Sequence, residues 1–170
     1  MKTLFSYWTL VLSFFVSLPA FSSSSQSPYR IYIDAGSSGA RLGIMRVDYE
    51  ANGAFRVEEL TDFTPKKSLG IHQLFGKAQA DISAYVHELM DYAEKYLGMS
   101  LEKVPVHFYA TAGMRLLSKE DQDQLLRQVV EALRTQHHCE LIQARVITGQ
   151  EEGMFGWYAV NSLIGALSDP

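Results

Sequence analysis

Three glycine-containing segments of this chain carry side chains suited to holding phosphate. They are Asp34–Arg41 (DAGSSGAR), Ala110–Arg115 (ATAGMR) and Thr148–Gly153 (TGQEEG). Each follows an apolar stretch that is typical of a β-strand. In α/β proteins, ligands collect at the ends of strands where such loops emerge. We therefore expect the three segments to converge on one anionic ligand.

The first segment combines backbone, hydroxyl and cationic donors for an anion. Its glycines leave backbone N–H groups open to approach, its serines add hydroxyls and its arginine adds a guanidinium. These phosphate-binding candidates are Gly36, Ser37, Ser38, Gly39 and Arg41. Asp34 closes the preceding strand and is placed to hold a metal-bound water. Because no Gly-Lys-Ser/Thr follows, the segment is not a P-loop, and a plain hairpin turn is the alternative interpretation.

The other two segments supply a phosphate contact and a base. Thr111 and Arg115 flank a glycine turn and can organise water and phosphate, although a plain strand-to-helix connection is the alternative. Thr148 and Glu151 have the spacing of a capping box, which gives Glu151 a structural role. Glu152 has no such role, and a helix N-terminus keeps a first-turn carboxylate ionised. Glu152 therefore suits a general base acting on water, the alternative being an ordinary acidic first-turn residue.

The elements that must position these segments are three strands followed by alternating helices and strands. The expected strands are Tyr29–Asp34, Arg41–Tyr49, Phe55–Phe63, Val104–Tyr109 and Leu141–Ile147. Helical spacing of apolar residues predicts helices over Ile82–Leu97, after a Ser118 cap with Asp121, and from Thr148 towards Leu167. The order βββαβαβα predicts an α/β lobe with a mixed five-stranded sheet flanked by helices.

The N-terminus has the pattern of a secretory signal peptide. Lys2 precedes an apolar run, Leu4–Leu18, and small residues follow. A membrane anchor is the alternative, but the run is shorter than the roughly 20 apolar residues of a span and no stop-transfer charges follow. We expect residues 1–22 to be the signal, 23–28 a flexible mature N-terminus and 29–170 the folded lobe. The protein should be secreted or periplasmic, with no stable membrane anchor after cleavage.

The charge and the cysteine content limit which binding partners and cross-links are possible. The formal net charge is −4 and no basic run occurs, which argues against a nucleic-acid partner. An anionic substrate would then need a cation to mediate its contact. Cys139 is the single cysteine, so no intrachain disulfide is possible. The run His137-His138-Cys139 lies between a helix and a strand, and we interpret it as a surface turn rather than a metal cluster.

Taken together, the three segments resemble the first three apyrase motifs of the ecto-nucleoside triphosphate diphosphohydrolase family. The matching stretches are Asp34–Arg41, Tyr109–Leu117 and Ile147–Leu163, and their order and spacing agree over about Tyr29–Leu167. The chain is similar to the bacterial exported members, including the Legionella enzyme. The resemblance implies an actin/hexokinase-like (ribonuclease H-like) fold, with this chain as the N-terminal lobe.

The resemblance also implies an activity and roles for residues. The activity is hydrolysis of the terminal phosphate of nucleoside tri- and diphosphates with Mg²⁺ or Ca²⁺. Glu152 matches the catalytic base, the first segment matches a phosphate-binding loop, and Thr111 and Arg115 match active-site positions. Gln150 and Asn161 are further positions of the third motif.

Two departures from the family pattern matter. Ala40 stands where the family usually has threonine. The fourth and fifth motifs, which belong to a second lobe, do not occur, so we expect a truncated form that is inactive by itself. Two other interpretations stay open: an exopolyphosphatase-like phosphohydrolase of the same fold, and a non-catalytic actin-like module for nucleotide binding or assembly.

Overall fold

The computed structural model describes residues 27–50, 55–61 and 66–164. The chain divides into two compact units, one over Ser25–Ile147 and one that contains the residues from Thr148 onward. The strands are β1 (Tyr29–Ala35), β2 (Ala40–Tyr49), β3 (Phe55–Glu59), β4 (Lys66–Lys67), β5 (Val106–Ala110) and β6 (Ile142–Val146). The helices are α2 (Gln79–Leu97), α3 (Lys119–His137) and α4 (Gly149–Leu163), with short 3₁₀ helices η2 (Ile71–Leu74) and η3 (Met114–Leu116).

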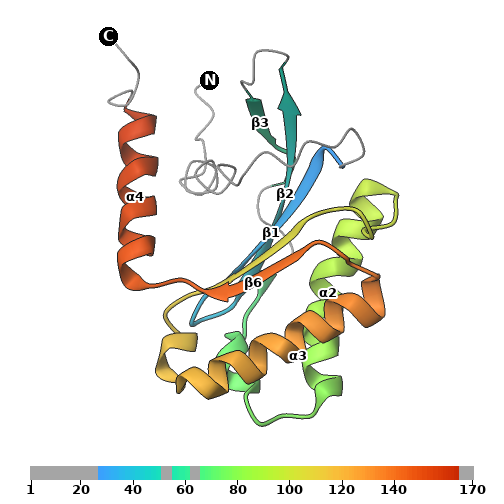
Figure 1. The fold of residues 1–170 in the computed structure, drawn as a ribbon, viewed down its shortest axis with the longest axis vertical. Coiled ribbons are helices and arrows are strands. Elements are labelled where there is room, and N and C mark those ends of the chain that lie inside the picture. The colour runs from blue at the N-terminus through green and yellow to red at the C-terminus, as the bar shows by residue number, and fades with distance from the viewer. Residues whose placement is uncertain (1–26, 51–54, 62–65, 165–170) are drawn as a thin grey trace. The chain divides into compact units, whose positions relative to one another are not determined.

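All six strands belong to one mixed sheet in the first unit (Figure 1). The strand order is β3-β2-β1-β5-β6, and β4 pairs separately with β2. The pairs β1–β2 and β2–β3 are antiparallel, whereas β1–β5 and β5–β6 are parallel. The predicted mixed sheet and its element order are confirmed, with the two-residue β4 as an addition. Because β1, β5 and β6 run parallel, they end at the same edge, and each of the three motif segments begins at such an end.

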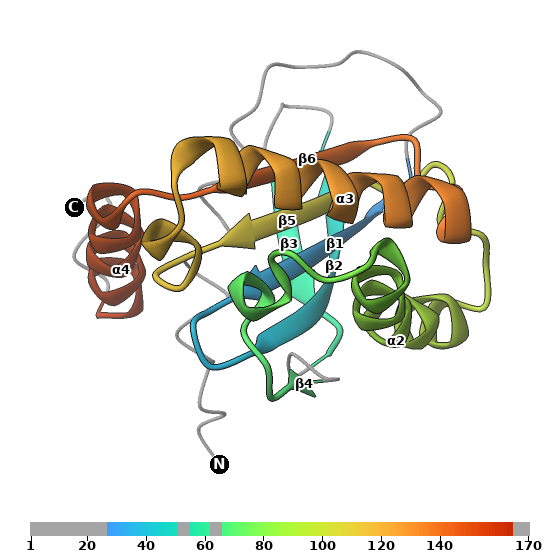
Figure 2. The ribbon, with the colours of Figure 1, turned by 90° about the horizontal axis from the view of Figure 1, so that it is seen from below.

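The core lies between one face of the sheet and the helices α2 and α3, which both cover that face (Figure 2). The strands alternate, so that every second residue of β1 enters the core while its neighbours face the opposite side. Fully buried core side chains come from every layer: Ile31, Ile33, Leu42, Ile44, Phe108, Val86, Leu89, Leu125, Val129 and Leu133. Each such side chain stabilises the fold by about 1.5–3 kcal/mol. The first two motif loops therefore emerge from strands that are packed into the core.

The opposite face of the sheet carries a buried polar and aromatic cluster. Tyr32 stacks on His107, with ring centroids 4.7 Å apart and planes 12° apart. The Tyr109 hydroxyl donates to Oε1 of Gln143 over 2.7 Å, and His107 Nδ1 lies 3.0 Å from the same oxygen. Burial lowers the pKa of His107 to about 4, because the charged imidazolium would lose its hydration.

Capping residues set the helix boundaries largely as predicted. The Ser118 hydroxyl accepts from the Asp121 N–H over 3.2 Å at the start of α3. Gly98 ends α2 in a left-handed conformation, φ 63°, which glycine adopts without strain. At the end of α3, His138 adopts the left-handed conformation with φ 52°.

Some predicted boundaries are wrong. The third strand was expected to reach Phe63 but ends at Glu59, because the Thr61 hydroxyl replaces the backbone carbonyl as acceptor for the Ile44 N–H (3.0 Å). The first loop is shorter than expected, since β1 extends to Ala35 and β2 begins at Ala40. The last helix ends at Leu163, and residues 165–167 lie outside the described part of the chain.

The interpretation of residues 137–139 as a surface turn is wrong for two of the three. His137 and Cys139 are buried, and only His138 is exposed. His137 is held between α2 and α3, with Nδ1 3.0 Å from Glu94 Oε1 and Nε2 3.3 Å from His87 Nδ1. Burial raises the pKa of the Cys139 thiol to about 12. Among the described residues, no group of three or more histidine, cysteine or acidic side chains is arranged to hold a metal ion.

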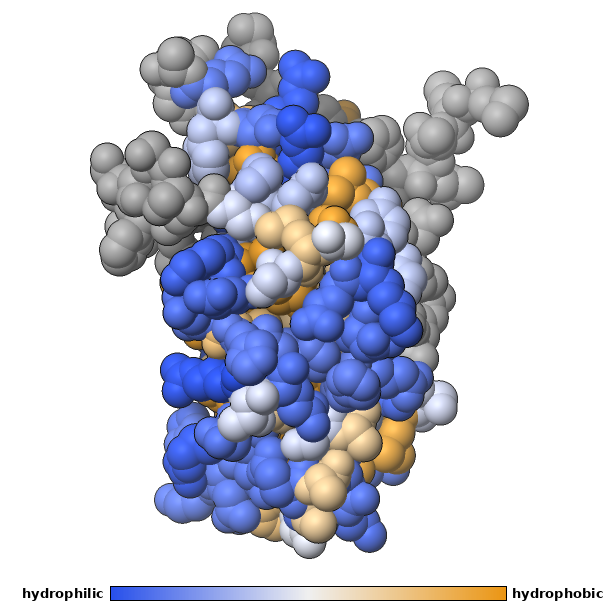
Figure 3. Space-filling view, turned by 90° about the vertical axis from the view of Figure 1, so that its right-hand side faces the viewer, coloured by the Kyte–Doolittle hydropathy of each residue, from blue (hydrophilic) through white to orange (hydrophobic). Residues whose placement is uncertain are grey.

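Seen from the side of α2, the surface is mostly hydrophilic with small apolar patches (Figure 3). Within the described ranges, no helix combines the length and apolar character needed to cross a bilayer. The predicted signal, residues 1–22, lies outside those ranges, as does most of the predicted mature N-terminus.

Candidate active site

The first motif forms a four-residue loop, 36–39, between β1 and β2, with the side chains of Ser37 and Ser38 exposed. Gly39 presses against β4: a Cβ built there would lie 1.9 Å from the carbonyl oxygen of Lys67. A Cβ at Gly36 would lie 3.4 Å from the Gly39 oxygen and 3.9 Å from the Thr111 hydroxyl. The loop is thus packed backbone against backbone, while its serine side chains remain accessible.

Asp34 and Arg41 face each other across the hairpin and form an ion pair. They are cross-strand partners, and Arg41 Nη2 donates to Asp34 Oδ2 over 2.9 Å. The Asp34 side chain is 14% exposed and the Arg41 side chain 36%. The sequence had assigned Arg41 to phosphate and Asp34 to a metal-bound water. In the structure each group lies beside its partner, so the guanidinium also neutralises a largely buried carboxylate.

The second motif packs directly against the first. The Thr111 N–H donates to the Ala35 carbonyl over 3.0 Å, which extends the β1–β5 pairing past the strand ends. Thr111 itself is buried, with its hydroxyl beside Gly36. A Cβ at Gly113 would lie 2.9 Å from the Cα of Ser37. The structure therefore brings together the two segments that the sequence predicted to converge.

Arg115 links the second motif to the end of β6. Its Nη1 donates to the Ile147 carbonyl over 2.8 Å, and Ile147 immediately precedes the third motif in the chain. The Ile147 N–H in turn donates to the Ala110 carbonyl over 2.9 Å. Arg115 is exposed, and part of its role is to fix the relative position of two strand ends.

The third motif opens α4 with the predicted capping box. The Glu151 N–H donates to the Thr148 hydroxyl over 3.1 Å, and the Thr148 N–H donates to Glu151 Oε2 over 2.7 Å. Glu151 thus has the structural role that its spacing predicted. The Glu152 N–H donates to the Thr148 carbonyl over 3.0 Å, and its side chain is exposed in the first helical turn.

The two remaining motif positions differ in their surroundings. Gln150 is exposed in the first turn of α4. Asn161 Nδ2 donates to the Trp157 carbonyl over 2.7 Å, one turn earlier in the same helix. The contact of Asn161 is therefore with its own helix backbone.

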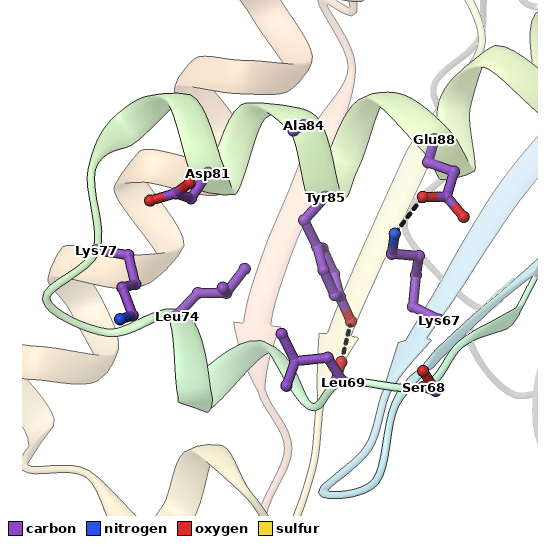
Figure 4. Close-up of a pocket in the computed structure, with 9 residues that line it drawn as sticks. All are labelled: Lys67, Ser68, Leu69, Leu74, Lys77, Asp81, Ala84, Tyr85 and Glu88. Atoms are coloured by element: carbon purple, nitrogen blue, oxygen red, sulfur yellow. Dashed lines mark hydrogen bonds and ion pairs between the residues drawn. The ribbon is translucent and has the colours of Figure 1, made fainter.

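A fourth segment, from β4 to η2, supports the first loop and was not predicted from the sequence. A Cβ at Gly70 would lie 2.3 Å from the carbonyl oxygen of Ser37. The segment is held from α2, where the Tyr85 hydroxyl donates to the Leu69 carbonyl over 2.8 Å and Lys67 pairs with Glu88 (Figure 4). An open groove of about 520 Å³ lies alongside these contacts. A two-residue strand has no periodicity, so only the glycine at position 70 hinted at this close approach.

Beside the first loop, Asp34 at the end of β1 offers a carboxylate to a cation. Mg²⁺ keeps several waters and binds through one or two carboxylates together with substrate phosphates, rather than in a cage of protein ligands. A single strand-end carboxylate beside a loop of anion donors fits that kind of site.

Comparison with known proteins agrees with this geometry. Residues 21–170 match the GDA1/CD39 (nucleoside phosphatase) family. Ectonucleoside triphosphate diphosphohydrolase 1 of Rattus norvegicus is 36% identical over 141 residues, covering 81% of this chain and 27% of the rat protein. The Golgi apyrase of Schizosaccharomyces pombe is 31% identical over 158 residues, covering 83% and 28% respectively. The chain thus spans less than a third of the length of these relatives.

A solved structure shares the fold. The crystal structure of nucleoside triphosphate hydrolases from Neospora caninum superposes with a TM-score of 0.62 at 20% identity, covering 84% of this chain and 32% of that one. The predicted actin/hexokinase-like (ribonuclease H-like) α/β lobe is confirmed. By its sequence from residue 21 onward, and in keeping with its sheet topology and motif order, the chain belongs to the GDA1/CD39 (nucleoside phosphatase) family.

Proposed function

We propose that this chain is the N-terminal, phosphate-holding lobe of a nucleotidase that removes the terminal phosphate of nucleoside tri- and diphosphates. The observation that carries the proposal is the direct packing of the first two motif loops. Gly36 lies beside the Thr111 hydroxyl and Ser37 lies against Gly113, so hydroxyl and backbone donors from both loops meet at one edge of the sheet. The similarity to the rat ectonucleoside triphosphate diphosphohydrolase and to the Schizosaccharomyces pombe apyrase supports the substrate class.

The proposed reaction is attack of water on the terminal phosphorus. Glu152 takes a proton from the water as the new oxygen–phosphorus bond forms. The bond to the bridging oxygen breaks, and the shortened nucleotide leaves with that oxygen. Ser37, Ser38 and the backbone N–H groups of their loop donate to the oxygens of the transferred group, where charge accumulates.

A divalent cation, Mg²⁺ or Ca²⁺, would be held through water by Asp34 and would neutralise negative charge on the phosphates. The chain's own net charge is −4, so the chain as a whole supplies no excess positive charge for that purpose. Arg41, paired with Asp34, keeps the carboxylate oriented at the strand end.

We further infer that the protein is of the bacterial exported type and that a second lobe completes the site. The apolar run Leu4–Leu18 supports export, as secretion or into the periplasm. The relatives are more than three times as long as the matched region, which supports a second lobe that grips the phosphates from the other side. We expect the 170-residue chain by itself to release no phosphate, and release by the purified chain would contradict the need for that lobe.

Two adjacent glutamates provide the test of the base. In an enzyme that completes this lobe with a second one, Glu152→Gln should lower phosphate release from ATP by at least about 100-fold with little change in nucleotide binding. Glu151→Gln is the matched control, because it removes the same charge one residue away and glutamine still forms the capping box. Equal losses in both variants, or retained turnover in Glu152→Gln, would exclude Glu152 as the base.

A substrate panel separates the proposal from its rivals. ATP, ADP and inorganic polyphosphate are compared with Mg²⁺ and with Ca²⁺. Cleavage of polyphosphate without cleavage of nucleotides would assign an exopolyphosphatase-like activity. Binding of nucleotide by the complete enzyme without any phosphate release would assign a binding or assembly module.

A further inference from the structure

The imidazole of His72 lies where the first two motif loops meet. His72 belongs to η2, and its ring packs against the backbone of two glycines. A Cβ at Gly113 would lie 2.3 Å from His72 Nδ1, and a Cβ at Gly70 would lie 2.7 Å from Cε1 of the same ring. Side chains larger than hydrogen at either position would overlap the imidazole. The ring is therefore wedged between the second motif turn and the β4–η2 segment.

Ser37 of the first loop contacts the same two glycines. A Cβ at Gly70 would also lie 2.3 Å from the Ser37 carbonyl oxygen, and one at Gly113 would lie 2.9 Å from the Ser37 Cα. The His72 ring and the backbone of Ser37 thus both pack against Gly70 and Gly113, and Gly113 belongs to the second motif.

The two ring nitrogens have different surroundings. Nδ1 is buried and makes no hydrogen bond with any described residue. A proton on Nδ1 would be left without an acceptor and would point at the backbone of Gly113, at a cost of about 1–3 kcal/mol. The ring proton therefore belongs on Nε2. Since the side chain as a whole is partly exposed while Nδ1 is buried, the ring meets solvent through its other atoms, on the side of Nε2.

We propose that His72 is a phosphate-binding residue of this lobe. Its Nε2–H donates to an oxygen of the polyphosphate held between the first loop and the second motif turn, beside the exposed hydroxyl of Ser37. The proposal rests on the proposed function, because it places one more donor in the same site. It differs from the motif assignments in that His72 lies on none of the three segments.

The test uses amides that mimic one ring nitrogen at a time. In His72→Gln the amide nitrogen takes the place of Nε2, whereas in His72→Asn it takes the place of Nδ1. Mg²⁺-imidodiphosphate, a non-hydrolysable probe, is titrated into the full chain and followed by NMR, which detects millimolar binding. We expect binding by His72→Gln within about threefold of the wild type. His72→Asn and His72→Leu should bind about tenfold more weakly, the loss of one hydrogen bond to a charged group.

The outcomes separate this proposal from the function on which it rests. Wild-type affinity in folded His72→Leu would overturn the role of His72 and leave the proposed function standing. No binding by the wild-type chain would overturn phosphate binding by this lobe, and the role of His72 with it. Should His72→Leu not fold, the Gln and Asn variants give the answer. A ¹⁵N spectrum of the wild-type imidazole with the proton on Nδ1 would also overturn the proposal.

Discussion

Replacement of Gly39 by alanine tests how tightly the first motif loop is packed. The added Cβ would lie 1.9 Å from the Lys67 carbonyl oxygen and 3.0 Å from its carbon. Real Cβ contacts essentially never fall under 3.0 Å, so the Cβ and the oxygen must move apart by at least about 1.1 Å. The obstacle is backbone of β4, which pairs with β2 through Ala40 and Lys67, and it cannot turn away as a flexible side chain can. The substitution must therefore break the β4 pairing or deform the loop.

Overpacking of this kind costs about 1–3 kcal/mol, and the loss of the β4 pairing raises the expected destabilisation to about 2–3 kcal/mol. With a urea m value of about 2 kcal/mol/M for a chain of this size, the unfolding midpoint should fall by about 1–1.5 M. The midpoint is measured by circular dichroism at 222 nm on the full chain. If the m value is the same in both proteins, the lower midpoint reflects a lower stability of the folded state.

Gly36→Ala is the matched control in the same loop. Its Cβ would lie 3.4 Å from the nearest atom, an ordinary contact, and its free energy of unfolding should stay within about 0.5 kcal/mol of the wild-type value. If Gly39→Ala unfolds at the wild-type urea concentration, or if both variants lose the same stability, the close approach of Gly39 to β4 is refuted.

Two further predictions concern the third motif and pH. Thr148→Ala removes the hydroxyl of the capping box and should destabilise the start of α4 by about 1 kcal/mol. Backbone amides there should exchange with solvent roughly five times faster, whereas in Thr148→Ser they should exchange at the wild-type rate. The pKa of His107 is lowered to about 4 from 6.5 in the folded protein. Between pH 6.5 and pH 4 the unfolded chain therefore binds more protons than the folded chain, and the free energy of unfolding decreases as the pH is lowered. Between pH 7 and pH 5 the wild type should lose about 2 kcal/mol more than His107→Gln, and parallel urea curves for the two proteins would contradict this.

The fold was predictable because its elements have local signals. Alternating apolar residues marked the strands, and the Ser118 cap and the Gly98 stop marked two helix ends, each a property of a few neighbouring residues. The third strand was extended too far because Thr61 has the β-branched side chain of a strand residue. Its hydroxyl, however, takes the place of a backbone acceptor. A pattern of residue types does not distinguish these two uses of threonine.

The missed features depend on contacts between distant parts of the chain. His72 touches Gly113, 41 positions later, and nothing in its own neighbourhood indicates that contact. His137 was expected in a surface turn because it lies between a helix and a strand, yet it is buried against Glu94 of the preceding helix. The Asp34–Arg41 pair is different, since it follows from the loop length. Once the loop spans 36–39, the hairpin register makes these residues direct partners.

Some motif residues hold the loops together, and others are exposed and able to bind a ligand. Gly39 and Gly113 lie against backbone from other segments, where any Cβ would overlap, so they serve assembly. Arg115 contributes to assembly as well, because its guanidinium holds the Ile147 carbonyl just before the third motif begins. The exposed hydroxyls of Ser37 and Ser38 have no such task in the packing. Loss of a serine hydroxyl should therefore weaken phosphate binding at constant stability, whereas changes at the glycines should alter both together.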